Sequence, residues 1–271
     1  MVDHSDQTLA EIRMRKFSSL EKALRALDAV AKARSIGLRE LAAELGFPHA
    51  TLHRLLAVLT SCRYLTQDPK TKKYRLSLKF LELSAAVRED LDLITVARPH
   101  MTALMEASSE TVNLALFDGA GIIYVDQVAN ANSFLRMFTR VGARVPLHCT
   151  GVGKACLAGL PNEAVTEYWS GAKKESYTEK TITDELHLRK DLEAIHLLGY
   201  AVDNEEMEIG VRCVAAPIRQ DRGRIVAAVS VSGPSSRLTP ERIAFVGELV
   251  RQAAGRISVD LGYPGEEISS E

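Results

Sequence analysis

Apolar residues recur at helical spacing three times in the N-terminal part of the chain. The first stripe predicts a helix over 18–33, and Ser18 with Glu21 forms a capping-box pattern at its start. The second and third stripes predict short helices over 38–47 and 50–62. Three closely spaced amphipathic helices indicate a small helical unit at this end of the chain.

A tight turn joins the second and third predicted helices. Gly46 lies where a left-handed C-cap residue is expected, and Phe47-Pro48 enforces extended backbone. This pattern is typical of a helix-turn-helix, whose second helix enters the DNA major groove with its N-terminal end first. A three-helix bundle with a polar face is the alternative. The candidates for contacts with bases and phosphates are Arg39, Pro48, His49, Ala50, Thr51, His53 and Arg54.

A basic hairpin is predicted directly after the third helix. Residues 64–67 and 74–76 are short strand-like runs, and Asp68-Pro69 begins the turn between them. A hairpin in this position is typical of the wing of a winged helix-turn-helix. Lysines on the wing would lie along the phosphate backbone and supply salt-sensitive affinity, without choosing a sequence. They are Lys70, Lys72 and Lys73. A helical pattern over 76–90 then connects this unit to the rest of the chain.

The remainder of the chain alternates strand-like and helical patterns. The strand-like runs are 110–118, 122–128, 133–139, 213–218 and 225–233. The helical runs are 152–159, 162–170, 184–198 and 240–261, after a helix that ends near Ser108 and has Pro99 in its first turn. Hairpin-linked strands with helices between them predict an α+β body with a largely antiparallel sheet.

Composition divides the chain in the same way as the patterns do. The chain has 271 residues, which suggests two domains, and its net charge is −1. Residues 1–80 carry fifteen Lys and Arg against eight Asp and Glu, a net charge of +7, which leaves −8 on the rest. A basic head and an acidic body indicate two different partners, and the basic head favours nucleic acid.

Other sequence features set limits on the location of the protein. No apolar run approaches the length of a membrane span, and the first residues lack the apolar stretch of a signal peptide. The four cysteines form no CxxC pair, so we expect a reducing cytoplasm without disulfides.

Two places in the body could bind a small anion. The run TGVGK over 150–154 lacks the spacing of a phosphate loop, but Thr150 can cap a helix whose first N–H groups, from Gly151 and Val152, favour a carboxylate. Ser230 and Ser232 alternate in an apolar strand, so their hydroxyls face one side and need partners. A plain helix cap, and hydroxyls bonded to backbone or water, are the alternatives.

The segment 199–213 is rich in acids and ends at a cysteine. Asp203 could accept hydrogen bonds from a ligand, whereas most of the other acids, Glu205, Glu206 and Glu208, are expected to be solvated loop charges. Cys213 with a histidine and an aspartate could form a nucleophilic triad, which keeps a small-molecule enzyme as the alternative function. No local motif marks such a site, and buried cysteine is usually a small apolar residue. His148, Cys149 and Cys156 have no familiar metal-ligand spacing, so we predict neither a metal nor a cofactor.

Five segments together resemble one known family. They are ELAAELGFPHATLHRLLAVL, the wing end YRL, PLHCTGVGKACLAGLP, GYAVDNEEMEIGVRCVAAPI and VSVSGPSSRLT. This sequence is similar, from about residue 17 to 262, to the IclR family of bacterial transcriptional regulators. The resemblance implies a winged helix-turn-helix at 17–78, a linker helix at 79–92 and a GAF/profilin-like effector-binding domain at 93–263, with helices on both faces of the sheet.

The resemblance also implies a function and a set of ligand contacts. Members of the family regulate catabolic operons in response to small organic acids, and bind palindromic double-stranded operators as homodimers that often pair into homotetramers. We therefore expect a regulator, most simply a repressor, controlled by a small carboxylate such as a sugar acid or a keto acid. The effector contacts that carry over are Phe134, Met137, Gly151, Val152, Asp203, Cys213, Ser230 and Ser232.

Overall fold

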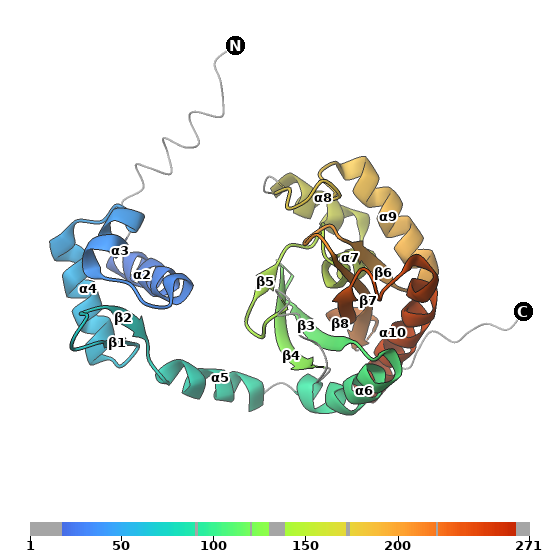
Figure 1. The fold of residues 1–271 in the computed structure, drawn as a ribbon, viewed down its shortest axis with the longest axis horizontal. Coiled ribbons are helices and arrows are strands. Elements are labelled where there is room, and N and C mark those ends of the chain that lie inside the picture. The colour runs from blue at the N-terminus through green and yellow to red at the C-terminus, as the bar shows by residue number, and fades with distance from the viewer. Residues whose placement is uncertain are drawn as a thin grey trace, which may run out of the picture. The chain divides into compact units, whose positions relative to one another are not determined.

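The computed structural model describes most of the chain and divides it, between residues 90 and 91, into two compact units (Figure 1). The described residues are 18–89, 92–119, 121–129, 139–171, 174–220 and 222–263. Among them, no helix combines the length and the apolar character that crossing a bilayer requires.

Within residues 18–89, the N-terminal unit contains four helices and one hairpin. The helices are α2 (Ser19–Ala33), α3 (Leu38–Leu45), α4 (His49–Ser61) and α5 (Lys79–Glu89), and the strands are β1 (Leu65–Gln67) and β2 (Tyr74–Leu76). The two strands are antiparallel, with Leu65 opposite Leu76. The predicted winged helix-turn-helix is therefore confirmed.

Local sequence signals determine where these helices begin and end. The Ser18 hydroxyl accepts a bond from the backbone N–H of Glu21 (3.2 Å), and the Glu21 carboxylate accepts one from the N–H of Ser18 (2.8 Å), which is the predicted capping box. Gly46 ends α3 in the left-handed region, at φ +67°. Buried leucines such as Leu41, Leu52 and Leu56 hold the three helices together.

The C-terminal unit is built on one six-stranded sheet. Its helices are α6 (Asp92–Ser108), α7 (Gly151–Leu157), α8 (Asn162–Gly171), α9 (Glu185–Leu198) and α10 (Pro240–Asp260). Its strands are β3 (Thr111–Phe117), β4 (Ile122–Val128), β5 (Arg144–Val145), β6 (Ala201–Asn204), β7 (Val211–Gln220) and β8 (Arg224–Pro234). The strand order is β5-β4-β3-β8-β7-β6, and every neighbouring pair is antiparallel, which confirms the predicted α+β fold class.

Each face of this sheet has its own core. Helices α6 and α10 lie together against one face, whereas α7 covers the other face and packs against α9 (Figure 1). Along β3 and β8, alternate residues enter the two cores: Leu114 and Val229 face α6 and α10, and Ala115 and Ala228 face α7. Residues one apart on these strands therefore belong to different environments.

The structure differs from the sequence-based prediction at three elements. Pro99 does not begin a helix but lies inside α6, because burial of Leu93, Ala97 and Met101 against the sheet outweighs the hydrogen bond that a proline removes. Strands β5 and β6 were not predicted, since they are two and four residues long. The predicted strand over 133–139 lies outside the described residues, except for Thr139.

Candidate nucleic-acid interface and ligand site

The start of α4 forms the exposed face of the helix-turn-helix. Leu52, Leu55, Leu56 and Leu59 of this helix are buried. The residues on the opposite side remain exposed or half-buried: Pro48, His49, Ala50, Thr51, His53 and Arg54, together with Arg39 of α3. Pro48 is the N-cap and makes no side-chain cap bond, so the first N–H groups of α4 point outward, where a phosphate can accept from them.

A network centred on Asp68 shapes the turn of the wing. Its Oδ1 accepts the backbone N–H groups of Lys70 (2.9 Å) and Thr71 (2.8 Å), and its Oδ2 pairs with Arg75 (3.2 Å). These backbone hydrogen bonds lower the pKa of Asp68, so the carboxylate stays ionised. Lys72 adopts φ +57° at the tip. The turn therefore presents its lysines on a defined backbone.

The wing lysines differ in their surroundings. Lys70 and Lys72 are exposed, whereas Lys73 is half-buried and pairs with Glu40 of α3 at 3.7 Å. Glu40 also accepts the backbone N–H of Gly37 at the start of α3 (3.1 Å). Lys73 thus links the wing to the helix-turn-helix, and Lys70 and Lys72 are the stronger candidates for phosphate contacts.

Helix α5 begins against the wing. The Lys79 ammonium lies 4.2 Å from the Tyr64 ring centroid and donates to the carbonyl of Cys62 (3.1 Å). The Phe80 ring meets Tyr64 edge-on, with centroids 5.7 Å apart, and the Ser77 hydroxyl donates to the carbonyl of Arg63. The first turn of α5 is therefore attached to the DNA-binding head.

In the C-terminal unit, polar side chains cross the sheet on the face that α7 covers. The Gln127 amide donates to Asn113 Oδ1 (2.8 Å), and the Asn113 amide donates to Ser232 Oγ (3.1 Å) and Ser230 Oγ (3.4 Å). The Ser232 hydroxyl in turn donates to Cys213 Sγ (3.0 Å). We call these five residues the polar row; with the exception of Gln127, all are buried. The predicted alternation of Ser230 and Ser232 onto one face is correct, and their partners are protein groups.

Asp203 lies next to the Cys213 end of the polar row. It lies opposite Cys213 in the β6–β7 register, so both side chains share the α7 face of the sheet. Tyr124 of β4 is also buried on this face, and its pKa is raised by burial and by Cys213 and Asp203. One small region is thus surrounded by polar side chains from four strands and by the Tyr124 phenol. The four strands are β3, β6, β7 and β8.

Helix α7 begins over this region. Thr150 caps it by accepting the Gly153 N–H (3.1 Å), as predicted. A Cβ on Gly151 would lie 3.3 Å from Ala215 Cβ and 3.5 Å from Cys213 Cβ, so the helix starts directly on β7. The Val152 side chain packs in the core, which leaves its backbone N–H as the group that could meet a ligand.

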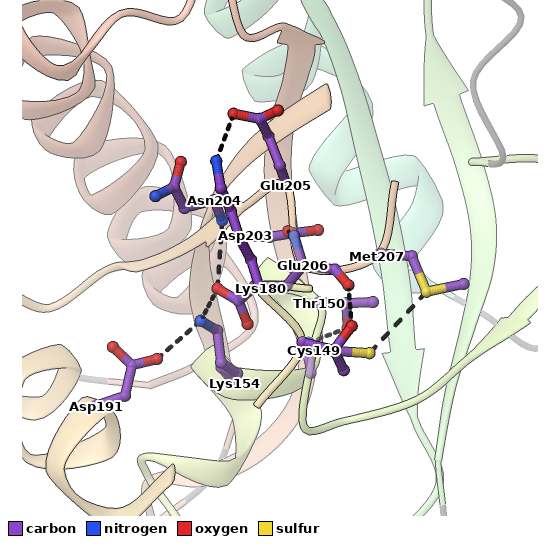
Figure 2. A network of polar contacts seen from close by, with 12 residues as sticks. Cys149, Thr150, Lys154, Lys180, Asp191, Asp203, Asn204, Glu205, Glu206 and Met207 are labelled. Carbon is purple, nitrogen blue, oxygen red and sulfur yellow. Dashed lines mark hydrogen bonds and ion pairs between the residues drawn. The ribbon is translucent and has the colours of Figure 1, made fainter. Parts of the chain in front are cut away.

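A buried ion cluster ties α7 to its surroundings (Figure 2). Lys154, only 1% exposed, lies 2.6 Å from Glu206 Oε1 and 2.7 Å from Asp191 Oδ2 of α9. Burial alone would lower the pKa of Lys154, but the two carboxylates outweigh it and raise the pKa, so the lysine is charged. Glu206 is 5% exposed, so it is not one of the solvated loop charges that the sequence predicts for most acids of this segment. Its apolar surroundings are tolerated because Lys154 compensates its charge.

The loop after β6 connects this cluster to Asp203. The backbone N–H of Glu206 donates to Asp203 Oδ1 (2.8 Å), and Glu206 Oε1 accepts the N–H of Asn204 (3.2 Å). Burial, and secondarily the Glu206 charge, raise the pKa of Asp203 to about 7. Glu205 pairs with Lys180 (2.9 Å) on the outer side of the loop.

The structure therefore brings together most of the candidate ligand contacts. Gly151, Asp203, Cys213, Ser230 and Ser232 meet where α7 begins, and Val152 adds its backbone. Phe134 and Met137 lie outside the described residues. Sequence reasoning missed Asn113, Gln127 and Tyr124, although a lone amide in the apolar run TVNLALF was a usable signal.

The surroundings of the cysteines and of His148 do not make a nucleophilic site. Burial raises the pKa of the Cys213 thiol, which opposes formation of a thiolate. His148 instead contacts the Tyr168 hydroxyl (3.0 Å) and the Glu175 carbonyl (3.1 Å). Within the described ranges, no group of three or more His, Cys, Asp or Glu side chains has an arrangement that could hold a metal ion.

The chain combines a winged helix-turn-helix, which has a basic wing, with an α+β unit in which buried polar groups lie under the start of a helix. This combination is typical of a class of bacterial DNA-binding transcriptional regulators. Two family models match the chain: "IclR helix-turn-helix domain" over residues 19–69 and "Bacterial transcriptional regulator IclR C-terminal" over residues 85–259. The chain belongs to the IclR family of transcriptional regulators.

Individual relatives agree with this assignment. The HTH-type transcriptional repressor AllR of Escherichia coli K12 is 39% identical over 228 residues, which cover 84% of each chain. The HTH-type transcriptional regulator KdgR of the same organism is 34% identical over 246 residues, 91% of this chain and 93% of KdgR. The crystal structure of Thermotoga maritima IclR matches with a TM-score of 0.73 and 33% identity, covering 90% of this chain and 99% of that one. Like these relatives, the chain is a transcriptional regulator and not an enzyme.

Proposed function

We propose that this protein is an operator-binding repressor of a catabolic operon and that a small organic acid controls its binding to DNA. The observation that carries the proposal is the combination, in one chain, of an exposed α4 start beside a lysine-tipped wing and a buried polar row beneath the start of α7. The repressor function of the relative AllR supports the negative sign of regulation.

In the proposed complex, α4 reads the major groove. Thr51, His53 and Arg54 contact base edges or phosphates, and Ala50 allows close approach. Pro48 and His49 lie at the same end of the helix, and Arg39 of α3 lies toward the backbone. Lys70 and Lys72 follow the phosphates, with Lys73 supporting the wing.

The proposed effector is a carboxylate held where α7 begins. The N–H groups of Gly151 and Val152 donate to it, Ser230 and Ser232 bond its oxygens, and Asp203 completes the polar contacts. Cys213 borders the site as a neutral thiol. We assign Phe134 and Met137 to its apolar wall on the family resemblance alone.

We further propose that the protein acts as a homodimer, or as a pair of dimers, on a palindromic operator. The family models support a division into a DNA-binding domain at 17–78, a linker helix at 79–92 and an effector domain at 93–263. An effector can change DNA affinity only by binding two arrangements of the dimer unequally.

Gel-shift titration of the full-length protein against its own upstream DNA tests the proposal. We expect tight binding to that DNA, weaker binding to a scrambled duplex, and release by one acid among sugar acids, keto acids and aromatic acids. Arg54→Ala should cost about 1–3 kcal/mol if this side chain reads a guanine, because the bidentate contact is lost. Equal affinity for the scrambled duplex would refute sequence-specific regulation.

A further inference from the structure

The acidic cluster around Asp203 has few hydrogen-bond donors for an incoming anion. Asp203, Glu206 and Asp191 are three carboxyl groups, and Lys154 pairs with two of them. Asp191 and Glu206 also line an outer pocket with Lys180, His187 and Arg212. The Lys154 ammonium already lies within 2.7 Å of both Asp191 and Glu206. Glu206 Oε2 is buried and has no hydrogen-bond partner within the part of the chain that the structure describes.

The burial of Asp203 makes the shortage of hydrogen-bond donors for an anion more severe. The residue is 1% exposed, and Oδ1 accepts the Glu206 N–H (2.8 Å). The Met207 N–H is a second backbone donor to this carboxyl, but burial and the Glu206 charge outweigh both bonds in their effect on its pKa. The other titratable groups that face it are the Cys213 and Cys149 thiols and the Tyr124 phenol, all kept neutral by burial. An ionised Asp203 would therefore repel a ligand carboxylate at short range in a medium that screens charges poorly.

We propose that Asp203 meets the effector as a carboxylic acid: its protonated oxygen donates a hydrogen bond to the ligand carboxylate, so that each effector anion is bound together with one proton. The inference rests on the proposed carboxylate site and specifies how that site is regulated. The proton comes from solvent, no covalent bond changes, and Oδ1 keeps its bond from the Glu206 N–H. Effector sensing thereby becomes dependent on pH.

The direction of this dependence follows from linkage. Burial and Glu206 raise the pKa of Asp203 to about 7 in the unliganded protein, and a bound anion raises it further. Binding therefore takes up a proton, and affinity falls as pH rises through 7. Free small carboxylic acids are already ionised above pH 6, so their own titration adds nothing. We expect Kd to increase by about tenfold between pH 6 and pH 8.

Isothermal titration calorimetry on the full-length protein tests the inference with pyruvate, gluconate and 4-hydroxybenzoate as probes. For a probe that binds, titrations at pH 7 in buffers of different ionisation enthalpy should report uptake of about half a proton per site. Asp203→Asn keeps a donor at this position and cannot ionise, so the ratio of its Kd values at pH 8 and pH 6 should fall to about one. Glu208→Gln removes an exposed acid from the same loop and should keep the wild-type ratio.

The outcomes separate this inference from the proposed function. If none of the three acids binds the wild-type protein at pH 6, the proposed carboxylate site fails, and the protonated Asp203 with it. If an acid binds without proton uptake, or binds more tightly at pH 8, the site stands and the inference is overturned. An Asp203→Asn variant with the wild-type ratio would assign the proton to another group and would also overturn it.

Discussion

At the scale of single residues, Lys154 explains why the run TGVGK is not a phosphate loop. The lysine that a phosphate loop would direct toward its ligand is instead enclosed between Glu206 and Asp191 (Figure 2). Its charge compensates Glu206 in the loop after β6, and the backbone N–H of Glu206 bonds Asp203. We therefore expect Lys154 to be a structural ion and not a contact of the proposed effector.

Removal of the Lys154 charge should therefore destabilise the protein. Lys154→Met leaves two carboxylates facing each other, one of them buried, and we expect a loss of about 3–5 kcal/mol in the free energy of unfolding. Urea denaturation followed by circular dichroism measures this loss. Adding Glu206→Gln to the variant should recover part of it, because the uncompensated buried charge is then removed.

An exposed ion pair provides the matched control. Arg251 and Glu248 on α10 are about half exposed, so Arg251→Met should change stability by less than about 1 kcal/mol. Similar losses for Arg251→Met and Lys154→Met would show that burial gives Lys154 no special role.

At the scale of elements, the wing and α4 make different contributions to DNA binding. The wing turn is held by Asp68 and by the half-buried Lys73, so its exposed lysines can be changed without altering its backbone. Helix α4, in contrast, carries the side chains that we propose distinguish bases. Affinity and sequence choice should therefore separate by mutation.

Neutralising the wing should weaken binding to all duplexes alike. The double variant Lys70→Gln/Lys72→Asn places an asparagine where φ is +57°, a conformation that asparagine tolerates. Each lysine that contacts a phosphate should reduce the slope of log K against log salt by about one unit. Fluorescence anisotropy at several salt concentrations measures the slope. Lys190→Gln, an exposed change on α9, should leave it unaltered, and a variant that lost binding to the operator alone would contradict the wing assignment.

The elements also show where sequence reasoning succeeds and where it fails. Helices α2, α3 and α4 could be predicted because caps and stripes are local, as with Ser18 and Gly46. The polar row could not, because Gln127, Asn113 and Cys213 are far apart in sequence and only the sheet register aligns them. Likewise, the sequence does not show that Glu206 is buried, because its partner Lys154 lies far away in the sequence.

At the scale of the whole molecule, exposed leucines in the N-terminal unit support the proposed dimer. Leu20 and Leu24 on α2 are 69% and 53% exposed, and Leu78 and Leu81, at and near the start of α5, are 76% and 66% exposed. Large apolar side chains that are exposed to this extent often mark association surfaces, so α2 and the start of α5 are two candidate surfaces. A dimer would bring two heads onto one operator and multiply their affinities.

Charged substitutions on α2 should therefore weaken self-association. Leu20→Glu/Leu24→Glu is expected to shift the protein from dimer toward monomer in size-exclusion chromatography with light scattering, and to lower operator affinity at least tenfold because avidity is lost. Val259→Glu changes an aliphatic residue of similar exposure on α10 and should leave the dimer intact. A wild-type monomer at micromolar concentration would refute the proposed assembly.

The attachment of α5 to the head has a practical consequence for building hybrid sensors. Lys79 and Phe80 both contact the Tyr64 ring, so the start of α5 is part of the folded N-terminal unit. A chimaera that exchanges effector units should be joined beyond residue 89. The contacts of Lys79 and Phe80 with Tyr64 then stay in the same part of the chimaera as α4. A splice at residue 78 would remove the contacts of Lys79 and Phe80 with Tyr64 and expose the Tyr64 ring to water.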